Sequence, residues 1–423
     1  MIKVYNLNKY LSTLNFILIF VGYQLVTSLF LPGSSDIEGI SRKITIPYRA
    51  MALLVSASVI FININKKNGK LPKVLFVFWI YWIALVIRIF HDTSIRSDVH
   101  LNGNNQLWLY IFGIVIPSMY SVMVSYKKID LNKALKWIYF GIIVTLLLSL
   151  FNNSNLLKDA NEINERAGGN LALNSISFGH LGTSGILLSL YFLLEEKNQK
   201  LFKKAIFVAV LLFSFFIMLR AGSRSPLMAL LIILAFWQLA RNKSITIGII
   251  IAGLITIFLI LSIEPILNFI GNISPIIETR LKMSLYEGDS GGRDILYNEA
   301  FEIFLKYPIL GKQFALFNMY GGFTYSHNII LDSLIALGIL GGLAIIYVIS
   351  SAFYYSYKLI KIGDPNYWIC IILIQQIIMS MFSGAIYYSQ LLNSLLVFLF
   401  LYYKVLSSIK RKSLFNAEYS HYQ

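Results

Sequence analysis

The sequence has little charge and a single cysteine. Only 13% of its 423 residues are charged, whereas 57% are hydrophobic, and the mean hydropathy is +0.68. Soluble domains are nearer half apolar and a quarter charged, so this composition argues against a soluble globular protein and indicates a polytopic membrane protein. The one cysteine, Cys370, stands inside an apolar run. An intramolecular disulfide and a cysteine-based metal site are therefore excluded.

Signatures of nucleotide and metal chemistry are missing as well. The chain has no G-x-x-x-x-G-K-[ST], no H-E-x-x-H and no D-x-D pair for a metal-bound nucleotide sugar. Its histidines show no paired spacing; they are His91, His100, His180, His327 and His421. We therefore expect neither a metal site nor a cofactor.

Long apolar runs are what the chain has in abundance. About twelve are long enough to cross a bilayer. We place them near residues 11–31, 44–64, 73–90, 107–126, 134–151, 177–194, 203–219, 225–240, 244–263, 327–350, 367–385 and 388–407. The first has no small-residue cleavage site after it and is predicted to be a membrane helix, not a cleaved signal. The predicted fold class is an all-α polytopic membrane protein.

Basic residues gather on one side of these spans. Of the 36 Lys and Arg residues, 22 fall in the two termini and the even-numbered loops. The positive-inside rule makes that side cytoplasmic and places both termini there. Membrane topology therefore explains the net charge of +16, and nucleic acid is not an expected partner.

The kind of basic residue differs between the two sides. On the cytoplasmic side 20 of the 22 are lysine, whereas nine of the other 14 are arginine: Arg42, Arg49, Arg88, Arg96, Arg166, Arg220, Arg224, Arg280 and Arg293. A guanidinium offers a fixed fork of donors that suits phosphate or carboxylate. For the first four, headgroup contact or pairing with a nearby acid is the simpler interpretation. Anion binding is favoured for Arg166, Arg224 and Arg293.

An outer loop of about sixty residues, 264–326, is too long for a bare connection in a compact protein. Ser274-Pro275 predicts a helix start. After a Gly-rich break, Arg293–Lys306 has an apolar face and predicts an amphipathic helix that lies on the membrane and ends before Pro308. We call residues 264–326 the cap. The predicted division is residues 1–263 (nine spans, with an outer loop at 152–176), 264–326 (the cap) and 327–423 (three spans and a short basic tail).

The span after the cap opens with polar residues. His327 and Asn328 stand at its outer end, and Asp332 lies about a turn and a half inside. A carboxylate at bilayer depth costs about 2.5–3.5 kcal/mol on insertion scales. If Ser326 caps the helix, His327 stands in its first turn, where a neutral imidazole could take a proton from a hydroxyl while Asp332 orients it. Alternatively, the polar residues only cap the helix and Asp332 pairs with a neighbouring helix.

A second polar stretch, Arg220-Ala-Gly-Ser-Arg224-Ser-Pro, forms a short turn between two spans at their outer ends. A turn of small residues that brings backbone N–H groups and guanidinium groups together favours a cradle for an oxyanion or a diphosphate. The alternative is a tight turn whose arginines reach the lipid headgroups.

These residues resemble the O-antigen polymerase and O-antigen ligase superfamily of bacterial envelope glycosyltransferases. That family has a His-Asn pair followed, after nine residues, by Gly-x-x-Gly, and here His327-Asn328 precedes Gly338-Ile-Leu-Gly341. Its large periplasmic loop carries an essential Arg before an amphipathic helix and a Pro-x-x-Gly turn, which Arg293 and Pro308-Ile-Leu-Gly311 match.

Further motifs of the family occur upstream. A Ser-Arg pair at the outer end of a span matches Ser223-Arg224, and R-x-G followed by Asn matches Arg166 and Asn174. An Arg with Gly eleven residues later, a loop motif among polymerases, matches Arg280 and Gly291. The chain departs from the family at Tyr297, where relatives often carry Trp.

The resemblance implies metal-independent transfer, with inversion, of a glycan from undecaprenyl diphosphate on the periplasmic face of the bacterial inner membrane. It implies that His327 is the base for the acceptor hydroxyl and that Arg224 and Arg293 supply fixed positive charge to the leaving diphosphate. The residues expected to bind the diphosphate or the glycan are Arg166, Arg220, Arg280, Asn328 and Asp332. The expected partners are the lipid-linked oligosaccharides, membrane lipid and a chain-length-regulating protein.

Three functions are compared. The hypothesis is a polymerase, which transfers the growing lipid-linked chain onto the terminal sugar of the next lipid-linked repeat unit. An O-antigen ligase would use the same donor but transfer it to lipid A–core. A flippase or other transporter predicts charges around a midplane cavity and broken helices in both halves of the chain, whereas the arginines here gather at one outer surface.

Overall fold

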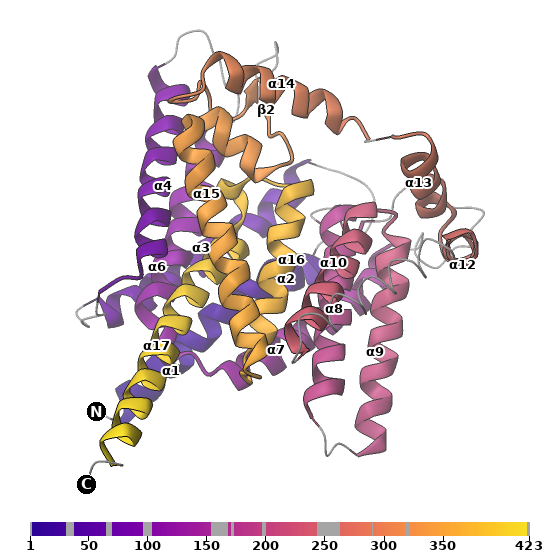
Figure 1. Cartoon of the computed structure of the whole chain (residues 1–423). Helices are drawn as coiled ribbons and strands as arrows, with labels where there is room; N and C mark the ends of the chain where they lie inside the picture. The colour runs from indigo at the N-terminus through magenta and orange to yellow at the C-terminus, as the bar shows by residue number, and fades with distance from the viewer. Residues whose placement is uncertain are drawn as a thin grey trace.

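The computed structural model describes residues 2–30, 38–64, 70–95, 104–153, 168–170, 173–196, 200–242, 263–289, 291–317 and 322–420. Most of these residues are helical (Figure 1). Ten helical segments are long and apolar enough to cross a membrane, and the shorter apolar helix α16 (Trp368–Phe382) matches the eleventh predicted span. The prediction of an all-α polytopic membrane protein is confirmed. The predicted span at 244–263 lies, except for its last residue, outside the described residues.

Several helices of the first half contain π-helical turns. The elements are α1 (Ile2–Ile17), η1 (Leu18–Gly22), α2 (Tyr23–Phe30), α3 (Glu38–Asn63), α4 (Lys73–Phe90), η2 (His91–Ile95), α5 (Asn104–Tyr110), η3 (Ile111–Val115), α6 (Ile116–Ser125), η4 (Tyr126–Lys128), α7 (Leu131–Asn152) and α8 (Ser175–Glu195). Of these, η1, η2 and η3 are π-helical. η1 and η3 interrupt two of the candidate membrane spans, and η2 forms the end of a third.

The second half holds the cap and the helices beside it. Its elements are α9 (Leu201–Arg220), α10 (Arg224–Arg241), α12 (Ile263–Ile273), α13 (Pro275–Tyr286), α14 (Arg293–Lys306), β1 (Leu316–Phe317), β2 (Phe323–Thr324), α15 (Ile329–Lys361), α16, η7 (Ile386–Tyr388) and α17 (Gln390–Ser420). The two short strands pair antiparallel, with Leu316 opposite Thr324.

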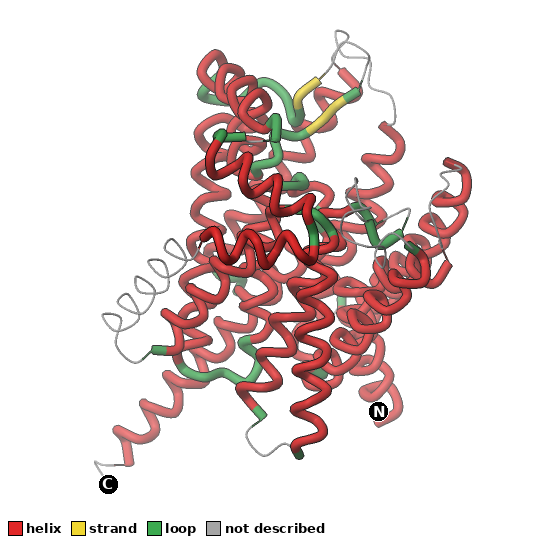
Figure 2. The backbone as a smooth tube through the Cα atoms, turned by 90° about the vertical axis from the view of Figure 1, so that its right-hand side faces the viewer, coloured by secondary structure: helices red, strands yellow, loops and turns green. Residues whose placement is uncertain are grey.

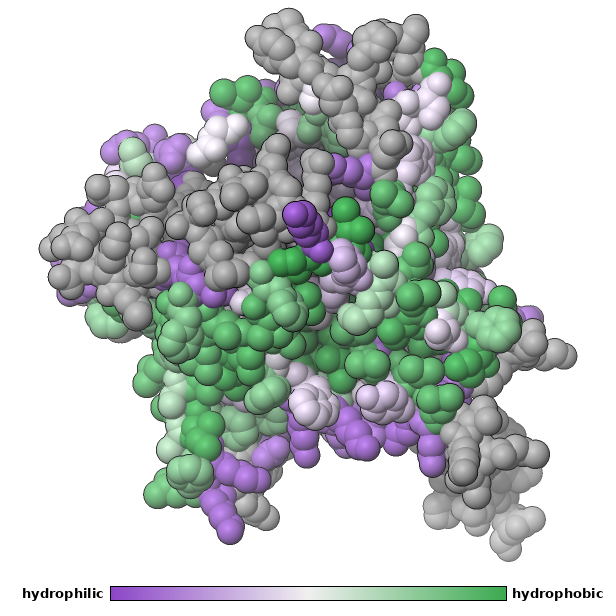
Figure 3. All heavy atoms as spheres, turned by 180° about the vertical axis from the view of Figure 1, so that it is seen from behind, coloured by the Kyte–Doolittle hydropathy of each residue, from purple (hydrophilic) through white to green (hydrophobic). Residues whose placement is uncertain are grey.

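The cap and the chain termini lie at opposite ends of the bundle. In Figure 1, α14 crosses the top, whereas the free ends of α1 and α17 point downward together. The small β-sheet lies at the same end as α14 (Figure 2). Seen from behind, hydrophobic residues surround the middle of the molecule and hydrophilic residues gather below them (Figure 3). This arrangement fits a bundle that crosses a membrane and exposes its cap on one side.

The cap helices begin where the sequence predicts. α13 starts at Pro275 after Ser274, and α14 starts at Arg293 after Gly292. Part of the predicted apolar face of α14 packs on protein: Ala300 is fully buried and contacts Leu316 and Ile335. That packing holds α14 against α15 and fixes the position of the residue at its start.

α15 is broken near its outer end. Gly338 has φ 64° and ψ −156°, a conformation that a helix cannot use. The Pro308–Gly311 turn enters the break, and the Ile339 N–H donates to the carbonyl of Pro308 at 2.7 Å. A Cβ on Gly338 would lie 2.2 Å from the carbonyl oxygen of Ile309. The two glycine motifs of the chain therefore pack against each other.

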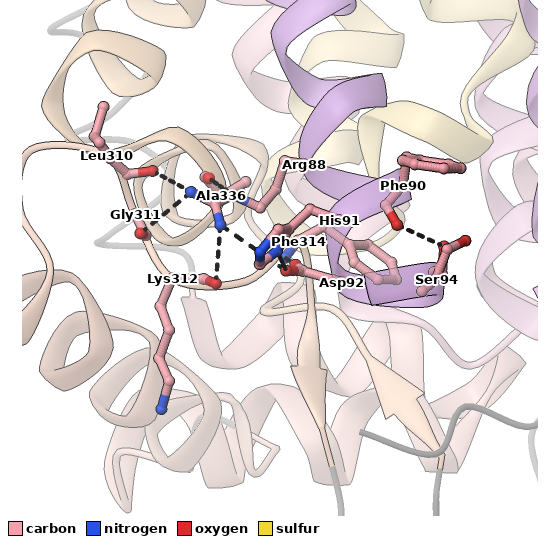
Figure 4. A network of polar contacts seen from close by, with 11 residues as sticks. Arg88, Phe90, His91, Asp92, Ser94, Leu310, Gly311, Lys312, Phe314 and Ala336 are labelled. Carbon is pink, nitrogen blue, oxygen red and sulfur yellow. Dashed lines mark hydrogen bonds and ion pairs between the residues drawn. The ribbon is translucent and has the colours of Figure 1, made fainter. Parts of the chain in front are cut away.

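Arg88 of α4 hydrogen-bonds to the backbone on both sides of the contact between the break in α15 and the Pro308–Gly311 turn (Figure 4). Its guanidinium donates to the carbonyls of Ala336 at 2.9 Å and Leu310 at 2.7 Å, and more weakly to those of Gly311 and Lys312. Its Nη1 also lies 3.9 Å from Oδ1 of Asp92, so Arg88 pairs with a nearby acid, while its other donors serve carbonyls of the broken helix and the entering turn and not lipid headgroups. Arg96 and the side chain of Arg42, predicted to act in the same way, lie outside the described part of the chain.

Candidate active site

His327 stands at the mouth of α15 in an unusual conformation. Its φ is 63°, and it is the one non-glycine residue with positive φ in the described chain. The helix begins at Ile329, because the side-chain oxygen of Asn328 accepts from the N–H groups of Ile330 and Leu331 at 2.9 and 3.3 Å. The predicted cap at Ser326 and the predicted place of His327 inside the first turn are therefore wrong. Left-handed strain outside glycine is typical of functional sites.

Asp332 holds the turn that carries His327. Its carboxylate is buried, with the residue 4% exposed. Oδ1 accepts from the backbone N–H of Ser326 at 2.8 Å and from its hydroxyl at 2.7 Å. Asp332 thus acts on the backbone one residue before His327, and these two bonds are a large part of what keeps the strained turn in place.

The imidazole of His327 has an aromatic neighbour and a charged one. The ring of Tyr325 packs edge-on against it, with centroids 4.6 Å apart. Burial and the positive charge of Arg293 both lower the pKa of His327. Its Nδ1 is buried and makes no hydrogen bond within the described structure. The imidazole is therefore neutral at neutral pH, and its Nδ1 is free to make a hydrogen bond with a ligand.

Arg224 is the first residue of α10 and reaches into the cap. Its Nη1 donates to the carbonyl of Arg280 at 3.1 Å, to the carbonyl of Asp289 at 3.0 Å and to the Asp289 carboxylate at 3.3 Å. Arg224 is 11% exposed, whereas Asp289 is 40% exposed. The acid that the sequence around Arg224 lacks therefore comes from the cap, as Asp289.

Gly291 lies between two of these arginines. A Cβ on it would stand 2.8 Å from Nη2 of Arg224 and 3.7 Å from Nη2 of Arg280, and its φ of 71° also favours glycine. The eleven-residue spacing of Arg280 and Gly291 thus has a geometric meaning, because both residues stand beside Arg224. Burial and the charge of Arg293 lower the pKa of Arg280. Its Nε is buried without a hydrogen bond in the described structure.

Arg293 connects the other arginines to the histidine. Its guanidinium lies over the ring of Phe382 at 5.7 Å. Burial and the charge of Arg224 lower its pKa, although a guanidinium stays protonated at neutral pH. The hydroxyl of Tyr297 donates to the carbonyl of Met381 at 3.4 Å. These two contacts dock the start of α14 on the end of α16.

Four predicted residues therefore gather at one place, which we call the arginine–histidine cluster: Arg224, Arg280, Arg293 and His327. They come from α10, α13, α14 and the turn before α15. Three guanidinium groups come together here, and the Asp289 carboxylate, which pairs with Arg224, is 40% exposed, so the cluster concentrates positive charge. Such an arrangement suits an anion with several oxygens, and a diphosphate is one.

The remaining predicted site residues fare differently. Arg166 lies outside the described residues. Arg220 is 9% exposed and places its guanidinium over the ring of Phe216 at 5.4 Å, within its own helix. Of the two arginines in the predicted cradle, Arg224 is the one whose recorded contacts reach the cap. Asn328 uses its side-chain oxygen to cap α15.

Sequence reasoning missed two members of the site, Asp289 and Tyr325. Asp289 stands in the Gly-rich break between Arg280 and Arg293, where an acid among arginines was a usable signal. Tyr325 stands two residues before His327, and only the reversal of the chain at the turn shows that its ring meets the imidazole.

Comparison with known proteins gives one match. Residues 207–346 match the O-antigen ligase family. The match runs from α9 into α15, roughly a third of the chain, and contains all four residues of the arginine–histidine cluster. No curated protein and no solved structure matches the chain.

Proposed function

Because the chain belongs to the O-antigen polymerase and O-antigen ligase superfamily, we propose that it is a polysaccharide polymerase. The family supports transfer of lipid-linked glycan by a multi-pass membrane protein of the O-antigen pathway. The proposal is narrower: a glycosyltransferase that needs no metal, inverts the anomeric centre and works on the periplasmic face. Its donor is the growing glycan on undecaprenyl diphosphate, and its acceptor is the next lipid-linked repeat unit.

The observation that carries the proposal is the convergence of Arg224, Arg280, Arg293 and His327 from four separate segments. A lipid diphosphate donor brings its own leaving group, so the protein has to supply charge and a base. The cluster holds both. No three His, Cys, Asp or Glu side chains gather within the described residues.

The reaction follows from this placement. The acceptor hydroxyl attacks the anomeric carbon of the donor from the face opposite the diphosphate. The new glycosidic bond forms as the bond to the diphosphate oxygen breaks, and the lipid diphosphate leaves with the electron pair. The three guanidinium groups stabilise the negative charge that grows on it. The acceptor proton passes to the imidazole of His327, which later returns it to solvent.

A neutral imidazole is required for that step. Its lowered pKa keeps His327 unprotonated at neutral pH, and Asp332 fixes the turn that carries it. An imidazole that only orients the acceptor would use the same contacts. The pH dependence described in the Discussion separates the two roles, because a base must lose activity when it is protonated.

A ligase is the second candidate, because the matched family carries that description. The loop spacing shared with polymerases, Arg280 to Gly291, favours polymerisation, and both residues stand beside Arg224. Deletion of the gene separates the two. Loss of a polymerase leaves single repeat units attached to lipid A–core, whereas loss of a ligase leaves none. A deletion strain with bare core would overturn the polymerase assignment.

The expected protein partner is a chain-length regulator. In cells that lack the regulator, the chain should still make polymer, but without a preferred length. Electrophoresis of the surface polysaccharide measures this directly. Complete loss of polymer would instead mean that the regulator is part of the transfer machinery.

A further inference from the structure

A cavity of about 250 Å³ has Ser383, which hydrogen-bonds to Tyr325, in its lining. Its walls come from η1, α2, α3, η3, the end of α16 and the start of α17. Every described lining residue lies outside the segment that matches the family, 207–346. The residues that the argument uses are Tyr23, Arg49, Tyr110, Gln376, Tyr388 and Gln390.

Arg49 is the one charged residue among the described residues of the lining. Its guanidinium lies over the ring of Tyr110 at 5.1 Å and makes a hydrogen bond with Tyr23. Nε is buried and has no hydrogen-bond partner in the described structure. The predicted contacts of Arg49, lipid headgroups or an acid such as Asp36 or Glu38, fall outside what the structure describes. A charge at this depth normally meets an opposite charge, and no acid is found among the described residues that line the cavity. A bound anion would complete the pairing.

The rest of the lining suits a sugar ring. Tyr110 and Tyr388 meet edge to face, with centroids 5.3 Å apart, and present apolar surface. Gln390 donates from Nε2 to the hydroxyl of Ser118 at 2.7 Å, which fixes its amide while its carbonyl oxygen remains an acceptor. Small-molecule sites usually measure about 300–1,000 Å³ and combine aromatic walls with a few polar groups. This cavity is at the small end, which fits one sugar residue better than an oligosaccharide.

Two π-helical turns border the cavity. Ile19 of η1 and Ile114 of η3 both line it. π-helical turns inside α-helices occur frequently at functional sites, because the extra residue costs helix stability. In η1 the carbonyl of Leu18 accepts from the hydroxyl of Tyr48 at 3.0 Å, so a side chain of the cavity wall stabilises the irregular turn. This is an observation independent of the charge on Arg49.

The cavity connects to the transfer site through two residues. Ser383 lines it and hydrogen-bonds to Tyr325. The ring of Tyr325 packs on His327. A sugar held in the cavity therefore lies one layer of side chains from the imidazole. The next sugar of the same glycan can then reach the imidazole of His327.

We infer that this cavity binds an anionic sugar residue of the acceptor glycan, with Arg49 paired to its carboxylate or phosphate group. The assignment of the bound sugar to the acceptor glycan rests on the proposed function, whereas the binding of an anionic sugar does not. A polymerase needs to hold its acceptor apart from the donor diphosphate, and the cavity and the cluster provide two separate places.

Binding is tested with small probes on the whole protein in lipid nanodiscs, by saturation-transfer NMR. The probes are glucuronate, glucose 6-phosphate and glucose, and the first two distinguish carboxylate from phosphate. We expect transfer to at least one anionic sugar and little to glucose. Equal transfer to glucose, or full displacement by inorganic phosphate, would overturn the anionic-sugar assignment.

Variants connect the binding to Arg49. Arg49→Gln should weaken binding of the anionic sugar by about tenfold or more, because it removes a charge-assisted pair. Gln376→Ala should weaken it by a smaller factor and leaves the charges in place. Lys43→Gln, at an exposed position of the same helix, is the matched control and should bind normally. Unaltered binding by Arg49→Gln would refute the site.

Activity separates this inference from the proposed function. With purified lipid-linked repeat units, Arg49→Gln should raise KM for the acceptor about tenfold and leave kcat within a few-fold. An unchanged acceptor KM would refute the acceptor role. His327→Ala should bind the anionic sugar like the wild type while making no polymer. If His327→Ala polymerises normally, the proposed function fails and the sugar site still stands.

Discussion

Arg88 and Arg224 both stand at outer ends of membrane helices, yet the protein uses them differently. Arg88 spreads its donors over four backbone carbonyls of the broken helix and the entering turn. Arg224 makes its recorded contacts through Nη1 alone, and its acid partner, Asp289, is 40% exposed. A saturated guanidinium holds backbone in place, whereas an unsaturated one beside two others can meet a ligand. The two arginines therefore differ in how many guanidinium N–H donors remain for a ligand.

The largest effect is expected for His327, the proposed base, which lies beside Arg293. His327→Ala should lower the rate of polymer formation by roughly 10²–10⁴, the range of general acid–base catalysis. Thermal stability should change little, because Asp332 and Asn328 hold the turn through Ser326 and the helix N-terminus. Initial rates and melting curves on the same preparation measure both. A variant that keeps more than a tenth of the rate would exclude His327 as the base.

The ligand-facing arginine comes next. Arg224→Ala should lower kcat by about 10²–10³, the cost of removing one preorganised charge from a transition state. Asp289 remains exposed to water, and the two carbonyls that lose a donor, those of Arg280 and Asp289, should cost less stability than the four that Arg88 serves. The matched control is Lys306→Ala, which removes a charge from the exposed end of α14. Equal losses in both variants would indicate a general charge effect and contradict the account.

Arg88→Ala is expected to lower folding stability more than Arg224→Ala does. Removing its guanidinium leaves the carbonyls of Leu310 and Ala336 without donors and should cost about 1–3 kcal/mol of folding stability. The melting temperature should therefore fall further in Arg88→Ala, which removes the donor of four carbonyls, than in Arg224→Ala, which removes the donor of two. Arg88→Lys should recover part of the loss. If both alanine variants melt at the wild-type temperature, the distinction between saturated and unsaturated arginines is wrong.

The smallest effect is a displacement of the pH profile. Burial and Arg293 both lower the pKa of His327, so kcat/KM should be flat through neutral pH and fall on acidification, with a midpoint below the ordinary value of about 6.5. Arg293→Gln removes one of the two causes, and the midpoint should move upward, whatever the loss in absolute rate. A wild-type midpoint above 6.5 would mean that the group titrating is not His327.

The sequence predicts local features of this protein well. Gly292 and Pro308 bracket a helical pattern, and α14 has the predicted bounds, Arg293–Lys306. The roles of Arg49 and Arg88 could not be predicted, because their partners come from distant segments: Arg88 donates to Ala336, which stands 248 residues later. The break at Gly338 lies inside an unbroken apolar run, and only the entry of the Pro308 turn explains it.

The candidate site was predictable in its members and not in its geometry. His327, Arg224, Arg293 and Arg280 follow from motifs that the chain shares with a family. That Asp332 would hold Ser326, and that Arg224 would reach Asp289, depends on backbone positions that no spacing encodes. The cap brings these segments together, and its docking on α15 through Ala300 is a tertiary contact.

The most direct test is polymerisation in vitro. Purified lipid-linked repeat units are incubated with the protein in nanodiscs and excess EDTA, and polymer length is followed over time for the wild type, Arg224→Ala and Lys306→Ala. The account predicts equal rates for the wild type and Lys306→Ala. For Arg224→Ala it predicts a rate that is lower by about a hundredfold or more. Polymer formed by Arg224→Ala at the wild-type rate would contradict it, as would activity that disappears with EDTA.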